Sequence, residues 1–153
     1  MKTFIDQLKF LFRYNRGIIK NRSGNSNGAV QDYERAIELN PNDAELHYCC
    51  GIAKFDLKDR VGSILCYNKA IELAPNHAKA YFNRGLAKNK LFDFENAIKD
   101  YDKAIELENF ARAYLHRGLA KHMLGDKQGA RLDLTKAGEL GIPKAYDFIK
   151  AHC

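Results

Sequence analysis

Tryptophan is absent from the sequence, proline occurs three times, cysteine four times, and no apolar run reaches 18 residues. The missing run argues against a membrane-spanning helix, and residues 1–20 mix charged and apolar side chains too finely for a signal peptide. The cysteines form no C-x-x-C pair, no Cys/His spacing typical of zinc and no disulfide framework. We therefore expect a cytoplasmic protein without a metal ion and with reduced thiols at Cys49, Cys50, Cys66 and Cys153.

Positive charge is concentrated at one end of the chain. The net charge is +6, yet residues 1–30 hold six Lys/Arg against one acid, whereas the other 123 residues hold nineteen against eighteen. With 46% hydrophobic and 29% charged residues, the composition is that of an ordinary globular protein. A chain of this length buries roughly two-thirds of its unfolded surface and needs no cross-links. We expect a single domain over residues 1–153.

One stretch of sequence occurs three times with small changes. YNKAIELAPNHAKAYFNRGLAK at 67–88 returns as YDKAIELENFARAYLHRGLAK at 101–121, and YERAIELNPNDAELHYCCGIAK at 33–54 resembles both. Four series of residues each step by 34, 34 and 33 positions. They are Gly17, Gly51, Gly85 and Gly118; Ala29, Ser63, Ala97 and Ala130; Ala36, Ala70, Ala104 and Ala137; Leu39, Leu73, Leu107 and Leu140. A unit that cannot bury its apolar face alone stacks on copies of itself, which predicts a repeat protein.

Each unit is expected to contain two helices. The turn between them begins with a residue that favours helix starts: Asn25, Asp59, Asp93 or Asp126. Pro41 and Pro75 cannot continue the second helix of their units, and Asp43 and Asn76 are then placed to cap the next one. The glycines and alanines let two helix backbones approach closely, while large residues fill the wider gaps: Tyr33, Tyr67 and Tyr101.

This pattern resembles the tetratricopeptide repeat, a helix-turn-helix unit of about 34 residues with Gly, Tyr, Ala and Pro at set spacings. Four units cover roughly nine-tenths of the chain: 10–43, 44–77, 78–110 and 111–143. The resemblance implies an all-α fold, a right-handed superhelical α-solenoid. It departs from the family pattern at several positions, which include Arg13, His47, Asn109 and Leu134.

Both ends of the chain carry helix signals outside the four units. Thr3 and Asp6 have the spacing of a capping box, so the first helix is expected to begin before the first unit. A short capping helix is expected over about 142–151, where these residues share one face: Ile142, Ala145, Tyr146 and Ile149. Gly138 and Gly141 are expected to loosen the helix before it, as fits a terminal repeat.

No catalytic or cofactor motif is found. GNSNGA at 24–29 lacks the Lys-Ser/Thr of a phosphate-binding loop and lies at an expected turn. His116 and His122 are six residues apart, which places them on different faces of a helix and disfavours a shared metal ion. Carboxylates such as Asp100 lie among lysines and are expected on a solvated face. We expect a non-catalytic protein with no cofactor.

The resemblance implies that the first helices line a concave groove for segments of other proteins, so we expect a protein–protein interaction module, a scaffold or adaptor. The residues expected to line the groove are Tyr48, Phe55, Lys79, Phe82, Asn83, Asn89, Lys90, Arg112, His116 and His122. Their aromatic members would anchor a partner that carries apolar and acidic residues, which the polar members would orient. We expect this binding between the second and fourth units. A neighbouring row is expected in the core: Ile18, Ile52, Leu86 and Leu119.

Some members of this family clamp the C-terminal carboxylate of heat-shock chaperones with a Lys and an Asn. Tyr48 and Ile52 stand at those positions in the second unit, and Asn83, Arg112 and His116 resemble only part of the remaining clamp. We therefore expect no strong binding of a chaperone tail.

Two alternatives stay open. Nucleic-acid binding, the weaker of them, is suggested by basic residues interleaved with aromatic ones near the N-terminus: Lys2, Lys9, Arg13, Arg16, Lys20 and Arg22 beside Phe10, Phe12 and Tyr14. The aromatic spacing serves helix packing equally well, and the other three units are nearly neutral. Self-association through an uncovered end of the repeat stack is the second alternative, and a homo-oligomer would result from it.

Overall fold

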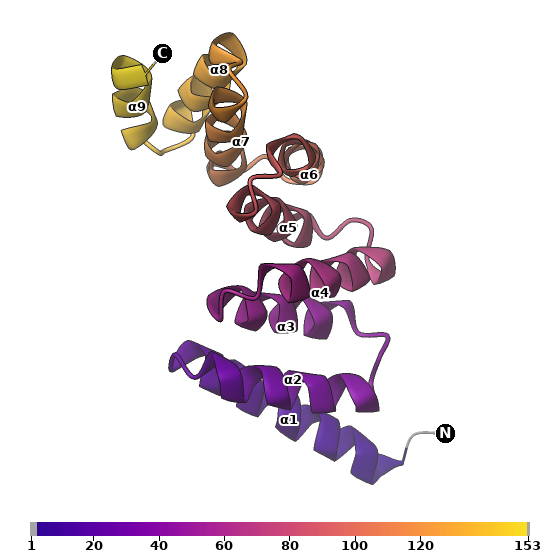
Figure 1. The fold of residues 1–153 in the computed structure, drawn as a ribbon. Coiled ribbons are helices and arrows are strands. Elements are labelled where there is room, and N and C mark those ends of the chain that lie inside the picture. The colour runs from indigo at the N-terminus through magenta and orange to yellow at the C-terminus, as the bar shows by residue number, and fades with distance from the viewer. Residues whose placement is uncertain (1–2, 153) are drawn as a thin grey trace. The chain divides into compact units, whose positions relative to one another are not determined.

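The computed structural model describes residues 3–152, and this part of the chain is all-α (Figure 1). Over that range there are nine helices: α1 (Phe4–Arg22), α2 (Ser26–Leu39), α3 (Ala44–Asp56), α4 (Arg60–Leu73), α5 (Ala78–Lys90), α6 (Phe94–Leu107), α7 (Ala111–Met123), α8 (Lys127–Glu139) and α9 (Lys144–His152). They belong to two compact units, residues 1–75 and residues 76–153, each with buried clusters of its own. The expected all-α fold of helix-turn-helix repeats is confirmed. The superhelical course and the single domain stay predictions.

Consecutive helices pack as hairpins within each unit. In the first unit α1 packs on α2 and α3 on α4, while in the second α5 packs on α6 and α7 on α8 (Figure 1). The first core includes Tyr33, Leu46 and Cys50, and the second includes Phe82 and Tyr101. The alanines between these large residues are fully buried and keep the helix axes close.

Most of the predicted helix starts are confirmed. The side chains of Asn25, Asp59 and Asp126 each accept a hydrogen bond from the backbone N–H three residues on, and Thr3 closes the predicted capping box. At α5 the prediction was wrong. His77, one residue beyond Asn76, is the N-cap, and its ring nitrogen accepts from the backbone N–H of Ala80 at 3.3 Å.

The repeated glycines make room for the repeated tyrosines. A Cβ atom added at Gly51 would lie 2.5 Å from a ring carbon of Tyr67, and one added at Gly85 would lie 2.7 Å from a ring carbon of Tyr101. Carbon atoms do not approach so closely, so only glycine allows the ring to lie against the backbone of the facing helix. In the fourth hairpin Leu134 takes the place of the ring.

The expected C-terminal helix is present as α9, which packs on α8. Ala145 is fully buried there, and Phe148 and Ile149 pack against the cluster that it forms with Leu134. Gly138 does not interrupt α8, which runs on to Glu139. Its missing Cβ instead leaves room for the ring of Tyr146, so the glycine that was expected to loosen α8 serves the contact with α9.

A buried aspartate joins the two helices in three of the four hairpins. Asp100 of α6 is 4% exposed, and its carboxylate lies 2.6 Å from Nη2 of Arg84 and 2.8 Å from Nζ of Lys88 on α5. The expectation of a solvated face was therefore wrong for Asp100, because the cations of α5 supply the partners that a buried carboxylate needs. The equivalent groups are Asp32 with Arg16 and Lys20, and Asp133 with Arg117 and Lys121. In the α3–α4 hairpin these positions hold Cys50 and Cys66.

Candidate functional site

Phe82 lies in the core of the second unit. Its side chain is 4% exposed, and its ring centroid lies 5.1 Å from that of Phe110, 5.6 Å from that of His116 and 5.9 Å from that of Tyr101. The guanidinium of Arg112 lies 5.1 Å from the same centroid. The prediction of Phe82 as a water-exposed anchor is corrected, because these neighbours have already removed its ring from water.

His116 is half-buried beside Phe82 and is expected to be neutral at pH 7. Burial, together with the nearby cations Arg112 and Lys90, lowers the pKa of His116 to about 4. Arg112, Lys90 and Lys79 are exposed. The positive charge that would orient an acidic partner therefore rests on these three side chains and not on the imidazole.

The other polar residues expected in the second unit lie in varied settings. Asn83 is half-buried. His122 packs edge-on against Phe148 of α9, with centroids 5.2 Å apart, and its Nδ1 atom is buried without a hydrogen-bond partner among residues 3–152. His122 thus takes part in the contact between α7 and α9.

Tyr48 and Phe55 belong to α3, in the first unit. The ring of Tyr48 is tilted against that of Tyr67, with centroids 6.1 Å apart. The guanidinium of Arg60 lies 3.9 Å from the Phe55 centroid and covers that ring. The ten residues expected to line one groove are therefore divided between the two compact units.

A cavity of about 380 Å³ lies in the first unit, and we name it the Asn21 cavity. It is lined by Tyr14, Ile18, Asn21, Arg22, Tyr33, Glu45, Tyr48, Cys49 and Ile52. Burial raises the pKa of Tyr14 well above its usual range and that of Cys49 to about 11, so both side chains are neutral at pH 7. The Oδ1 atom of Asn21 is buried and accepts no hydrogen bond from any residue between 3 and 152. Such an unpaired acceptor is uncommon in native proteins.

A second cavity, of about 260 Å³, lies in the second unit, and we name it the Asn89 cavity. It is lined by Asn89, Lys90, Phe92, Phe94, Leu119 and Met123. Asn89 stands two repeats after Asn21 in the same register, and its Oδ1 atom is likewise buried without a partner in the described part of the chain. Sequence reasoning named Asn89 and Lys90 but gave no sign of the unpaired acceptors, which depend on which neighbours reach each amide.

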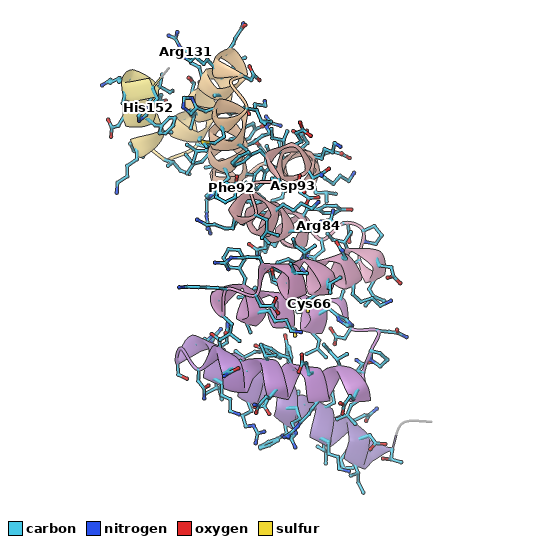
Figure 2. The ribbon with its side chains drawn as sticks, viewed as in Figure 1. Cys66, Arg84, Phe92, Asp93, Arg131 and His152 are labelled. Carbon is cyan, nitrogen blue, oxygen red and sulfur yellow. The ribbon has the colours of Figure 1, made fainter. Side chains whose placement is uncertain are left out.

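Phe92 lies in the turn between α5 and α6 (Figure 2). It was not among the site residues predicted from the sequence. Its side chain is 78% exposed, and its backbone has φ of 62°, a conformation that glycine adopts more easily. Gly24, Lys58 and Gly125 hold the equivalent positions of the other hairpins. The sequence could have indicated this residue, because an aromatic side chain stands at a turn position where two of the other hairpins have glycine. The exposed ring extends the apolar wall of the Asn89 cavity.

The N-terminal cations are largely engaged within the first unit. Arg13, Arg16 and Lys20 all form ion pairs with Asp32, and hydrogen bonds from Arg16 hold the pKa of that carboxyl far below its usual range. The stacked rings of Phe10 and Tyr14 pack against the first core. These contacts leave less free charge for nucleic acid than the sequence suggested. Lys2 and Cys153 lie outside the described residues.

Residues 3–152 contain neither a candidate membrane span nor a candidate metal site. No helix in that range combines the length and the apolar content that crossing a bilayer requires. Nor do three or more His, Cys, Asp or Glu side chains of the range gather as a metal site requires.

Comparison with known proteins adds family and structural evidence. A family model described as TPR repeat matches residues 17–58, and one described as Tetratricopeptide repeat matches residues 78–109. No curated protein matches the sequence.

Several solved structures share the fold. The crystal structure of MamA is 28% identical, with a TM-score of 0.84 over 90% of this chain and 81% of that one. MamA 41-end from Desulfovibrio magneticus RS-1 is 23% identical, with a TM-score of 0.89 over 94% of this chain and 83% of that one. The first TPR of Spaghetti (RPAP3), bound to the HSP90 peptide SRMEEVD, is 28% identical, with a TM-score of 0.75 over 77% of this chain and 94% of that one. The repeat register, the paired helices and these matches agree: the chain is a tetratricopeptide repeat protein.

Proposed function

We propose that this chain is a non-catalytic protein–protein interaction module and that the Asn21 cavity receives an extended segment of its partner. The observation that carries the proposal is the Asn21 cavity, whose lining includes Asn21, a residue with a buried Oδ1 atom that has no partner among residues 3–152. A buried acceptor without a hydrogen bond costs about 1–3 kcal/mol. A backbone N–H of a bound segment would remove this cost and fix the direction of the segment.

The other walls of the cavity suit a partner with both apolar and acidic residues. Tyr14, Tyr48 and Ile52 are neutral and apolar for most of their surface, and walls of this kind favour an apolar side chain. Arg22 is exposed and lines the same cavity, so its guanidinium can bind one carboxylate. Because Glu45 also lines the cavity, the preference for an acid depends on Arg22, and Arg22→Glu is expected to reverse it.

A structural neighbour supports a peptide as the ligand. The first TPR of Spaghetti (RPAP3), at 28% identity, is bound to the HSP90 peptide SRMEEVD. We do not expect the same peptide to bind tightly here, because Tyr48 and Ile52 stand where the resemblance places clamp residues in the second repeat, residues 44–77. The two proteins thus share a mode of binding in this proposal but not a ligand.

A peptide selected by display on the whole chain is the probe, and titration calorimetry on variants tests the site. Asn21→Ala is expected to weaken binding about tenfold because the peptide N–H loses its acceptor. Tyr48→Ala is expected to weaken it about 10- to 100-fold because an apolar wall is lost. Lys127→Ala is the matched control, since Lys127 is exposed, lies outside the cavity lining and is not among the residues expected to bind a partner.

Circular dichroism of each variant establishes that the helices are intact before binding is compared. The proposal fails if selected peptides bind the Asn21 and Tyr48 variants as tightly as the unchanged chain. A micromolar affinity for SRMEEVD in the same calorimeter would separately contradict the expectation of no chaperone-tail binding.

Self-association through α1 is a second candidate, favoured by one observation. Six large apolar residues of α1 are 50–73% exposed and share a face at helical spacings: Phe4, Ile5, Leu8, Leu11, Phe12 and Ile19. Light scattering over a concentration series is expected to show a rising mass for the unchanged chain and not for Leu8→Glu. A constant monomer mass for the unchanged chain would remove this candidate.

A further inference from the structure

The second hairpin breaks a pattern that the other three keep. Between α5 and α6 the buried carboxylate of Asp100 pairs with Arg84 and Lys88, and the first and fourth hairpins hold the same residue types in the same register. In the α3–α4 hairpin the lysine is kept as Lys54, but Cys50 replaces the arginine and Cys66 replaces the aspartate. Two thiols therefore stand where an ion pair joins the helices of the related hairpins.

The two thiols meet in the structure. Cys66 packs against the core cluster that contains Cys50, the two thiols interact, and both are reduced. Cys50 is fully buried, whereas Cys66 packs against the same cluster and keeps partial exposure (Figure 2). The residues that follow them, Gly51 and Tyr67, form the close glycine–ring contact of this hairpin, which holds α3 and α4 together at this level.

The surroundings make Cys66 the more acidic thiol. The hydrogen bond from Cys50 lowers the pKa of Cys66, and the ammonium of Lys54 lowers it further, although burial opposes both effects. Glu34, whose carboxylate lies 2.9 Å from Nζ of Lys54, weakens the effect of that cation. The contact with Cys66 and burial raise the pKa of Cys50. Cys66 is thus the partly exposed thiol that forms the thiolate more readily, and Cys50 is the buried thiol beside it.

We propose that Cys50 and Cys66 form a thiol-oxidation site, at which hydrogen peroxide links α3 to α4 through a disulfide bond. The Cys66 thiolate attacks one peroxide oxygen, the O–O bond breaks, and hydroxide leaves and takes up a proton to form water. Cys66 is then a sulfenic acid. The sulfur of Cys50 attacks the sulfur of Cys66, the S–O bond breaks, and the departing hydroxide leaves as water with the Cys50 proton. Two thiols lose two electrons and two protons, and one peroxide becomes two waters.

Cys49 is not part of this site although it is adjacent to Cys50. It lines the Asn21 cavity, on another side of α3, and its pKa is raised by burial to about 11. A thiol of this kind forms little thiolate at neutral pH and reacts slowly with peroxide. The expected bond is therefore specific for Cys50 and Cys66.

The whole reduced chain, treated with hydrogen peroxide and digested without reductant, tests the site by mass spectrometry. We expect a monomer that is lighter by about 2 Da, with one cross-linked peptide pair that contains Cys50 and Cys66. Its melting temperature is expected to rise by roughly 5–10 °C and to return on addition of dithiothreitol, because the bond restricts the unfolded chain. Cys49→Ser is expected to behave as the unchanged chain, and Cys66→Ser is expected to lose both changes.

The double variant Cys50→Arg/Cys66→Asp shows whether a lost response in Cys66→Ser reflects the missing thiol or a failure to fold. It is expected to fold because it places the Arg–Asp ion pair of the related hairpins at these positions. It is expected to keep the helical signal and to show no peroxide-dependent shift in melting temperature. The proposal is overturned if the unchanged chain forms its disulfide through Cys49 or Cys153, forms only bonds between chains, or accumulates sulfinic acid at Cys66 without a cross-link.

Discussion

Truncation of Phe82 is expected to destabilise the protein strongly and to act on folding before it acts on binding. The ring is 4% exposed and has three aromatic or imidazole neighbours with centroids 5.1–5.9 Å away. Phe→Ala in a packed core costs about 3–5 kcal/mol, and loss of the edge-on contact with Phe110 places Phe82→Ala in the upper part of that range. For a chain of this size, about 4 kcal/mol corresponds to a fall in melting temperature of roughly 8–16 °C.

Urea unfolding followed by far-ultraviolet circular dichroism measures this loss as a shift of the midpoint at constant slope. Phe92→Ala is the matched control in the same unit, because that ring is 78% exposed, and its loss is expected to cost less than about 1 kcal/mol. The burial of Phe82 would be refuted as the dominant effect if the two variants lost similar stability, or if Phe82→Ala lost less than about 1 kcal/mol.

Three further changes test the packing of the hairpins. Gly51→Ala is expected to lose about 1–2 kcal/mol in calorimetry despite a gain in helix propensity, because its Cβ would lie 2.5 Å from the ring of Tyr67; a stabilised variant would contradict this close approach. Asp100→Asn is expected to lose about 3 kcal/mol, because the half-buried Arg84 and Lys88 lose the buried carboxylate that pairs with both. The exposed Glu106→Gln should change stability by less than about 0.5 kcal/mol, and equal losses would argue against the buried pair. The pKa of His116 in the folded chain, about 4, lies below its ordinary value, so stability should be complete above about pH 6.5 and fall by at most roughly 3 kcal/mol as pH drops to 4. Urea midpoints from pH 7 to pH 4 check this window, and His116→Asn, which lacks the titrating group, should flatten the curve; an unchanged slope would assign the effect to another group.

The repeat organisation was predictable because the sequence signals of helix starts and helix contacts are local and occur in every repeat. Capping residues such as Asn25 and Asp59 mark helix starts through contacts within three residues, which need no tertiary structure. The pairing of Gly51 with Tyr67 follows from the same register in successive units. The missed cap at His77 shows the limit of such signals, since both Asn76 and His77 carry suitable acceptors and chain geometry selects between them.

The candidate site was less predictable, because a repeat helix packs against more than one neighbour. Phe82 has the spacing of a groove residue, yet Phe110 and His116, from a later part of the chain, cover it. The carboxylate of Asp100 has a polar face pattern, yet Arg84 of the preceding helix brings it into the interior. Spacing identifies the side of a helix on which a residue lies, but not the depth to which neighbouring helices bury that side.

Sequence alone predicts the four helical hairpins and the terminal helix that residues 3–152 form, because helix periodicity, caps and small residues act over short distances and recur at a fixed period. The register even contains the exchange of an ion pair for Cys50 and Cys66, which is visible once the units are aligned. Three features became visible only in the folded chain: these two thiols pack in one cluster, Phe82 is buried, and the Oδ1 atom of Asn21 has no partner among residues 3–152. These outcomes depend on the distances between side chains of different helices, and packing sets those distances only after the hairpins have formed.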